Sequence, residues 1–480
     1  MFVPRTEEHS INFLPPYFDP DYVEHAVKPF MAGSIVTGEK PMLPLIEGEL
    51  TKEKAIPPHL FGMLYEHWVP DMENEGLSVF LQGYENRGPD NERKRIYHSA
   101  FTPDLYGAAY RPKVQDFLDR LFADENAGKP MMQAYYASYF DLYWDLHLGV
   151  RGGDIPDQVR EIGKAFNTVI GFWFPTMDLV YQSYMKVRAL RPVLRDWIDA
   201  RTEDILQGRT PGYEKTIVHH WIKNGELKEN FRRKDIVFEC FHNFLAFSQW
   251  GNTLFNIVAR LEAGGGDAAV KDWFARTMAG DPDRVDAPPF SPLDRYTMEL
   301  FRTISPNGGS YSLSNARQSI GGQGVNGILT LHLPSSTNPL HWEDPQSFDP
   351  ERYRQVALTT DHDAASARRA GLQRCPFAQT ARALKDGRDG QVENSVYGAV
   401  YARVGGTAYP VPDTPGYAPF GFGYRRCPGE LFTIDFVKDF LRKVHAAGVR
   451  FDKLADDAPA KLPVGPLTVI EDRYAFRLAR

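Results

Sequence analysis

Ten residues near the C-terminal end, Phe420 to Gly429 (FGFGYRRCPG), have the types and spacing of a loop that presents a thiolate. Pro428 and Gly429 follow Cys427 and predict the start of a helix, because proline in a first helical turn has no intrahelical N–H bond to lose. The N–H groups of that turn carry partial positive charge, which favours a thiolate at Cys427. Since the thiolate is the form that binds metals, Cys427 is the predicted metal ligand.

The other residues of this loop indicate the kind of metal centre. Gly421 and Gly423 leave out the Cβ atoms that would collide with a porphyrin face lying against the turn. Arg425 carries a planar guanidinium that can pair with a heme propionate. The spacing therefore predicts a heme iron held by one cysteine, and the alternative is a chance glycine-rich turn around a buried cysteine.

The loop resembles the heme-binding loop of the cytochrome P450 superfamily, Phe-x-x-Gly-x-Arg-x-Cys-x-Gly. It matches every fixed position of that pattern, at Phe420, Gly423, Arg425, Cys427 and Gly429. The resemblance implies heme b (iron protoporphyrin IX) bound by this loop, with Gly421 also in contact and Cys427 as the axial ligand. It also implies a mainly α-helical fold with a small β region.

Two further signatures precede the loop in the order that the family has. Glu299-Leu-Phe-Arg302 resembles the family's Glu-x-x-Arg, and Phe348-Asp-Pro-Glu-Arg352-Tyr353 resembles its Pro-Glu-Arg-Phe segment. An isolated Glu-x-x-Arg is a weak signal, because such ion pairs are common on helix surfaces. With the later arginine, the three residues Glu299, Arg302 and Arg352 predict a structural network that holds the loop of Cys427.

A long amphipathic helix is predicted from Lys234 to about Glu262, in the position of the family's I helix. Oxygen-activating members carry Ala/Gly-Gly-x-Asp/Glu-Thr there, and the acid and the hydroxyl relay protons so that the O–O bond of dioxygen breaks. If Thr253 is that threonine, Asn252 stands at the acid position and Trp250 at the glycine position. Thr253 and Asn252 are the catalytic candidates, although an amide has no proton to give near neutral pH.

A second alignment of this helix is open. Phe247-Ser-Gln-Trp250-Gly251 faintly resembles the hydroperoxide-converting branch, the allene oxide synthases and hydroperoxide lyases, which need neither a proton relay nor an electron partner. That branch has a lengthened heme loop, whereas this chain has the ordinary one. Helix spacing does not distinguish the two alignments, because Gln249 with Thr253 and Ser248 with Asn252 are both i, i+4 pairs that could face the iron.

Elsewhere the pattern predicts mostly helix, with a strand pair at 320–333. The predicted helical segments are 112–123, 131–148, 157–187 and 192–207. A charged run after Asn91 includes Arg95 and His98, and the resemblance implies that one of them contacts a heme propionate; a solvated basic face is the alternative. Aromatic residues at 172–174 are expected to be core rather than pocket wall.

Length and composition fit one large domain. The 480 residues contain no linker-like or repetitive tract, with an N-terminal extension at 1–60 and an unusual insertion at 355–419. Three cysteines, of which Cys240 and Cys375 are expected to be inert, argue for a reducing compartment, here the cytoplasm. A net charge of −7 argues against a nucleic acid partner, and no apolar run predicts a membrane span.

The resemblance implies a heme-thiolate oxidoreductase, first of all a monooxygenase acting on an apolar small molecule. Such an enzyme would take electrons from a ferredoxin and a reductase. The alternatives are a peroxide- or hydroperoxide-dependent rearrangement or dehydration on the same iron, and a noncatalytic heme-binding or sensor protein.

Overall fold

The computed structural model describes the larger part of the chain. The described residues are 34–37, 96–169, 178–227, 231–287, 290–305, 309–313, 319–320, 323–324, 327–339, 342–354, 392–394, 400–404, 407–411, 419–420, 427, 429–454 and 474–479. They include neither residues 361–370, which belong to the insertion at 355–419, nor the aromatic residues at 172–174.

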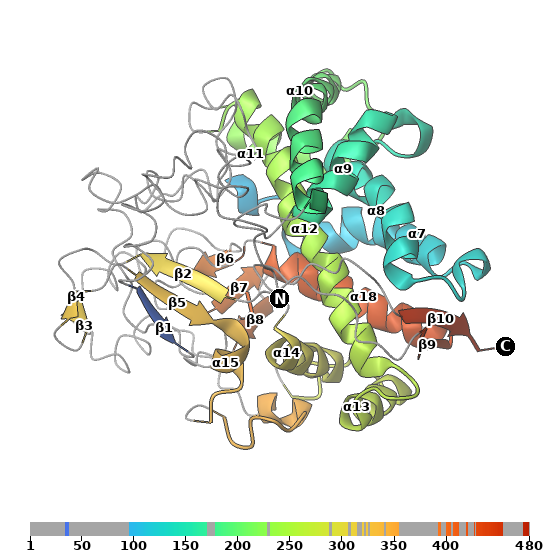
Figure 1. Ribbon diagram of the computed structural model, residues 1–480, viewed down its shortest axis with the longest axis vertical. Helices are drawn as coiled ribbons and strands as arrows, with labels where there is room; N and C mark the ends of the chain where they lie inside the picture. Colours follow the sequence, from blue (N-terminus) through green and yellow to red (C-terminus); the bar gives the residue numbers. More distant parts are fainter. Residues whose placement is uncertain are drawn as a thin grey trace.

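Four helices form the centre of the fold: α7 (Arg111–Leu121), α8 (Met131–Leu148), α12 (Arg233–Leu261) and α18 (Glu430–Ala446). In Figure 1, α12 runs through the middle of the molecule, with α7 to α10 on one side and the β1–β5–β2 sheet on the other. Aromatic side chains from all four helices belong to a single buried cluster. The predicted bounds of α8 are confirmed, and Gly149 ends it with a left-handed φ of 69°, a conformation that glycine adopts without strain.

The remaining helices surround this bundle. They are α6 (Pro103–Leu105), the π-helix η3 (Tyr106–Tyr110), α9 (Asp157–Val169), α10 (Asp178–Leu206), α11 (Ile217–Gly225), α13 (Ala268–Ala279), α14 (Pro292–Ile304) and α15 (His332–Ser336). Short 3-10 turns cover 124–126, 152–154, 213–215 and 350–353, the last labelled η7. Within the described part of the chain, no helix is both long and apolar enough to cross a membrane.

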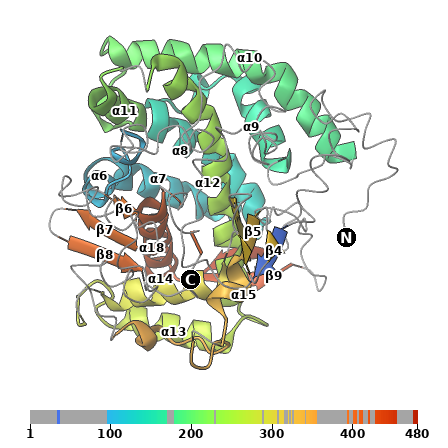
Figure 2. The same cartoon turned by 90° about the vertical axis from the view of Figure 1, so that its left-hand side faces the viewer.

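Helix α10 corrects one prediction. The break expected between residues 187 and 192 is wrong, because the helix continues through Pro192. An interior proline costs roughly 3 kcal/mol of helix stability, so packing must outweigh it. Figure 2 shows α10 crossing the top of the molecule. Arg191, the residue before Pro192, is fully buried, and its guanidinium lies 4.1 Å from the ring centre of Phe241 on α12.

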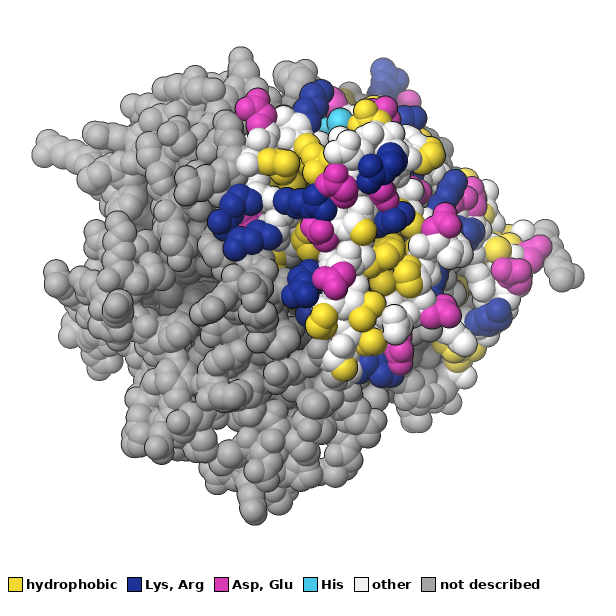
Figure 3. Space-filling view, turned by 90° about the horizontal axis from the view of Figure 1, so that it is seen from above, with side chains coloured by type: hydrophobic (Ala, Val, Ile, Leu, Met, Phe, Trp, Pro, Cys, Tyr) yellow, Lys and Arg dark blue, Asp and Glu magenta, His cyan; other side chains and the backbone are white. Residues whose placement is uncertain are grey.

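Ion pairs between helices lie on the upper surface. Figure 3 shows basic and acidic side chains interspersed over the described part of this face. Arg233 pairs with Asp199 at 2.6 Å and also with Glu203, and so ties the start of α12 to α10. Such exposed pairs contribute little each, so they orient the helices more than they stabilise them.

The strands within the described residues form four small sheets. Strand β5 (Gly327–Leu331) pairs in parallel with β1 (Ser34–Thr37) and antiparallel with β2 (Gly309–Leu313). The other pairings, all antiparallel, are β3 (Ser319–Ile320) with β4 (Gln323–Gly324), β6 (Val392–Asn394) with β7 (Val400–Val404), β7 with β8 (Thr407–Val411), and β9 (Val449–Lys453) with β10 (Tyr474–Leu478). The strand predicted to reach residue 333 ends at 331, where α15 begins, and its main partner is β2 rather than β3.

Two segments set apart in the sequence analysis contribute strands to these sheets. Strand β1 lies within residues 1–60 yet joins the sheet of β5, so the ordered fold begins before residue 60. Strands β6 to β8 lie within the 355–419 insertion and form an antiparallel meander there. The insertion is therefore partly regular structure and not only a long loop.

A buried hydrogen-bonded chain joins three parts of the core. His147 of α8 donates from Nδ1 to the carbonyl oxygen of Tyr143 at 2.9 Å, so its Nε2 accepts from the Nδ2 of Asn243 on α12 at 3.0 Å. The amide oxygen of Asn243 then accepts the hydroxyl proton of Tyr97. Burial lowers the pKa of His147 to about 3, so the ring is neutral at physiological pH.

This neutral histidine makes the stability of the protein depend on pH. Below a pH of about 6.5 the histidine binds a proton in the unfolded state but stays neutral in the native state. The free energy of unfolding therefore falls as the pH drops toward 3. We expect His147→Asn to flatten the pH dependence of the free energy of unfolding, measured by urea titration, by up to roughly 1.4 kcal/mol per pH unit in this window. Exposed His445 supplies the control, His445→Asn, and equal slopes in the two variants would contradict this assignment.

Candidate functional site

Cys427 lies immediately before the first turn of α18. Its backbone N–H donates to the carbonyl oxygen of Phe420 at 2.9 Å, which closes the loop between the first aromatic residue and the cysteine. Gly429 is the N-cap of α18, and a Cβ built on it would stand 3.9 Å from the Cys427 sulfur. The thiol therefore lies at the positive end of a seventeen-residue helix, where a thiolate is favoured.

The second described cysteine has the opposite environment. Cys240 is fully buried on α12, and burial raises the pKa of its thiol well above the ordinary value. Its carbonyl oxygen accepts the hydroxyl proton of Tyr143. Neither Cys240 nor Cys427 forms a disulfide, so Cys240 is an inert core thiol, as predicted, and Cys427 is the partly exposed one. Cys375 lies outside the described residues.

Several predicted contacts of the loop also lie outside the described residues. These are Gly421, Gly423, Arg425 and Arg95. Phe420 is described, and its ring packs at 4.7 Å between centres against Phe301 of α14. The start of the loop is therefore held by the helix that carries the Glu-x-x-Arg signature.

The predicted network of Glu299, Arg302 and Arg352 is present. Arg302 donates to both carboxylate oxygens of Glu299, with Nε to Oε2 at 2.8 Å and Nη2 to Oε1 at 2.7 Å. Arg352 of η7 donates to Oε1 at 3.1 Å. Glu299 and Arg302 are both fully buried. The i, i+3 pair of Glu299 and Arg302 is thus an ion pair of the core and not of the helix surface.

Two donors that the sequence did not reveal complete the shell of this carboxylate. The Tyr353 hydroxyl donates to Oε2 of Glu299 at 2.9 Å, and the Asp349 backbone N–H donates to Oε1 at 2.9 Å. The sequence contained a signal for the Tyr353 contact. Tyrosine stands where the family's segment has phenylalanine, and a buried tyrosine hydroxyl needs a hydrogen-bond partner.

Arg302 carries the network into the surrounding backbone. It donates to the carbonyl oxygens of Ser336, Pro345 and Ser347 at 3.0, 2.8 and 2.9 Å. This fixes the end of α15 and the 345–353 segment to α14. Phe301, the neighbour of Arg302 in sequence, then packs on Phe420, so the network supports the cysteine loop through one aromatic contact.

Ion pairs hold the helix that follows the cysteine. Asp439 of α18 is fully buried and accepts from the Tyr106 hydroxyl at 2.8 Å and from Arg111 at 2.7 Å. Lys438 donates to Asp294 of α14 at 2.5 Å. Helix α18 is therefore tied to η3 and α7 on one side and to α14 on the other.

His98 is buried, with 7 % of its side chain exposed, and lies in the helical segment 96–98. The following residues approach α18, since the rings of Phe101 and Tyr106 pack against Phe432 at 5.7 and 5.3 Å. The structure thus brings the segment of His98 to the helix that begins next to Cys427. Its proposed propionate contact stays a prediction.

The distal candidates Asn252 and Thr253 are both buried, with 3 % and 2 % exposed. Helix α12 turns about 100° per residue, so Thr253 lies about 60° around the helix from Trp250, while Asn252 lies roughly opposite Trp250. The backbone carbonyl of Asn252 accepts from the Nδ2 of Asn256 at 2.7 Å. The two candidates consequently occupy different sides of α12. The side chains of Ser248 and Gln249 are outside the described ones, so both i, i+4 pairings stay open.

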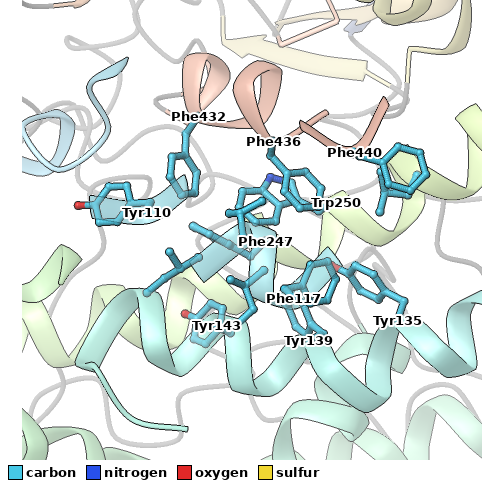
Figure 4. Close-up of a cluster of buried hydrophobic side chains, with 14 of the residues drawn as sticks. Tyr110, Phe117, Tyr135, Tyr139, Tyr143, Phe247, Trp250, Phe432, Phe436 and Phe440 are labelled. Atoms are coloured by element: carbon cyan, nitrogen blue, oxygen red, sulfur yellow. The ribbon is translucent and has the colours of Figure 1, made fainter. Parts of the chain in front are cut away.

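Trp250 and Phe247 point into the helical bundle. Figure 4 shows Phe432 and Phe436 extending from α18 toward Trp250 and Phe247. The Trp250 ring stacks on Phe436 with centres 4.1 Å apart, and its Nε1 donates to the Thr433 hydroxyl at 3.0 Å. The sequence analysis placed Trp250 at the glycine position of the I-helix pattern, and its side chain belongs to the contact between α12 and α18.

Comparison with known proteins gives a likeness in structure only. No protein-family model matches the sequence, and no curated protein matches it. Solved structures match over most of the chain, and one is the heme domain of a cytochrome P450DA mutant, with 14 % identity, a TM-score of 0.58, and coverage of 91 % of this chain and 87 % of that one. The chain has the cytochrome P450 fold.

Two other P450 structures have the same likeness. A zebrafish cytochrome P450 with abiraterone matches at 14 % identity and TM-score 0.56, covering 93 % of both chains. A cyanobacterial P450 with retinoic acid bound matches at 15 % identity and TM-score 0.53, covering 81 % of this chain and 78 % of that one. The predicted fold class, mainly α with a small β region, is confirmed.

Removing the Glu299 carboxylate tests its structural role in this P450 fold. We expect Glu299→Ala to lower the free energy of unfolding by about 3–5 kcal/mol, because Arg302 loses its buried counter-charge. Tyr353→Phe, which deletes a single hydrogen bond, should cost about 1 kcal/mol. Urea unfolding followed by circular dichroism measures both losses.

The control for this prediction is Glu161→Ala, which breaks an exposed pair with Lys186 at 2.7 Å. It should cost about 0–1 kcal/mol. A loss in Glu299→Ala no larger than in this control would mean that the buried network contributes nothing beyond a surface ion pair.

Proposed function

We propose that this protein is a heme-thiolate monooxygenase that acts on an apolar small molecule. The observation that carries the proposal is the position of Cys427, a partly exposed thiol at the N-terminus of α18 within a P450 fold. Electrons would come from separate redox proteins, a ferredoxin and its reductase.

The residues around Cys427 fit a heme bound through one sulfur. The thiol is the sulfur ligand that its loop offers, and the dipole of α18 favours its ionised form. Phe420, Gly421, Gly423 and Gly429 would bound the macrocycle, while Arg425 and either Arg95 or His98 would pair with its propionates. A thiolate-ligated heme, once bound, supplies the oxidising chemistry and favours O–O bond cleavage.

On the distal side, Thr253 is the residue that would hold a proton. Its Oγ1 can donate one hydrogen bond to an oxygen ligand and accept another from water. The Asn252 amide cannot release a proton near neutral pH, so its role is to donate a hydrogen bond, and the protons themselves would come from solvent. Burial of both side chains favours strong hydrogen bonds, because the local dielectric constant is low.

A specific observation favours a second candidate function. The acid position of the I-helix pattern holds Asn252, and the glycine position holds Trp250, whose side chain packs into the bundle. An enzyme that receives oxygen already reduced, as a peroxide or a hydroperoxide, needs no acid there. A peroxide-dependent P450-type rearrangement is therefore the alternative.

The assignment of Cys427 as the heme ligand predicts how replacing each cysteine changes the absorption spectrum. Reduced protein under carbon monoxide should absorb at the long-wavelength Soret position that a thiolate ligand produces, and Cys427→Ala should abolish this band. Cys240→Ala and Cys375→Ala should keep it. Loss of the band in either of these two controls, with retention in Cys427→Ala, would refute Cys427 as the ligand.

Variants of Thr253 distinguish an enzyme that activates dioxygen from one that uses a hydroperoxide. With a ferredoxin, a reductase and NAD(P)H under air, we expect turnover, and Thr253→Ala should divert electrons from product to hydrogen peroxide by about 10-fold or more, because general acid catalysis contributes factors of this size. Thr253→Ser keeps the hydroxyl and should stay near the wild type. Efficient turnover with a hydroperoxide and no electron donor, unaffected by Thr253→Ala, would favour the alternative.

A further inference from the structure

The contact of Trp250 links the two helices that carry the opposite sides of the proposed site. Trp250 is 3 % exposed, and its indole N–H donates to Oγ1 of Thr433 at 3.0 Å. The ring also lies flat against Phe436, at 4.1 Å and 12°, and 4.5 Å from Phe247. The position of this indole is therefore fixed both by a directed bond and by a stacked surface.

On α18 this contact ends one helical turn from Gly429, which lies two residues after the cysteine. The Thr433 backbone N–H donates to the carbonyl oxygen of Gly429 at 2.9 Å, the first hydrogen bond of the helix. Gly429 is the residue whose added Cβ would stand 3.9 Å from the Cys427 sulfur. A displacement of Thr433 thus moves the turn against which the thiolate lies.

On α12 the same contact sets the orientation of the distal candidates. Thr253 follows Trp250 by three residues, within one turn of an uninterrupted helix from Arg233 to Leu261. Because a helix rotates as a unit over such a distance, fixing the direction of Trp250 also fixes the direction of Thr253. Glycine at this position, as in the pattern that the helix resembles, would have no side chain to do so.

We propose that Trp250 is a positioning residue that couples the orientation of Thr253 on α12 to the thiolate-bearing turn of α18 through the hydroxyl of Thr433. This inference rests on the proposed function and deepens it. It assigns to Trp250 a role in the chemistry that acts through Thr253, while its own ring packs against Phe436 and Phe247 in the bundle.

Three variants isolate the hydrogen bond. Trp250→Phe keeps a stacked ring and removes the donor, Thr433→Val keeps the volume and removes the acceptor, and Thr433→Ser keeps the acceptor. We expect the first two each to raise electron loss to hydrogen peroxide by about 3- to 10-fold. Thr433→Ser should match the wild type, and the Trp250→Phe/Thr433→Val double variant should be no worse than either single one.

The route through Thr253 has its own test. In a Thr253→Ala background, Trp250→Phe should add no further electron loss, because the residue on which it acts is gone. Trp144→Phe is the matched control, a fully buried tryptophan of α8 in the same bundle, and should leave the electron balance unchanged. Additive losses from Trp250→Phe and Thr253→Ala, or an equal loss in Trp144→Phe, would overturn the proposal.

A readout without turnover separates this inference from the proposed function. Hydrogen exchange of the ferric holoprotein should accelerate in Trp250→Phe and in Thr433→Val over both 248–254 and 429–434, and not over α7. Acceleration on only one of the two helices would overturn the coupling even if monooxygenase activity is established. If both helices respond while no reductase-dependent turnover occurs, the coupling stands and only the proposed function fails.

Discussion

Burying a carboxylate is costly unless donors surround it, and the fold around the proposed site is organised by one such carboxylate, that of Glu299. Arg302, Arg352, Tyr353 and the Asp349 amide all donate to its two oxygens. These donors come from α14 and from η7, which are about fifty residues apart in sequence. Satisfying a single charge therefore requires that two distant segments meet in one geometry.

Further contacts extend this constraint to the cysteine loop. Phe301 of α14 packs on Phe420, Lys438 of α18 pairs with Asp294 of α14, and the N–H of Cys427 closes the loop onto Phe420. The loop of the reactive side chain is thus held by a frame of packed helices. Such a frame lets a partly exposed thiol keep a defined position, as a metal ligand must.

Local signals in the sequence predicted what depends on local physics. The end of α8 follows from the stop signal at Gly149, and the three-residue network follows from motifs in a known order. The features that local signals did not predict depend on packing between segments that are distant in sequence. Helix α10 continues through Pro192 because it lies across α12, and strand β1 joins β5, a partner almost 300 residues away in sequence. The direction of Trp250 depends likewise on α18, which no pattern within α12 reveals.

The central claim is that one sulfur, from Cys427, binds the iron of a heme. X-ray absorption at the iron edge of the purified ferric holoprotein tests this claim most directly, because it counts the ligands of the metal by element. The account predicts a single sulfur in addition to nitrogen ligands, and loss of that sulfur in Cys427→His. A first shell made only of nitrogen and oxygen in the unaltered protein would contradict it.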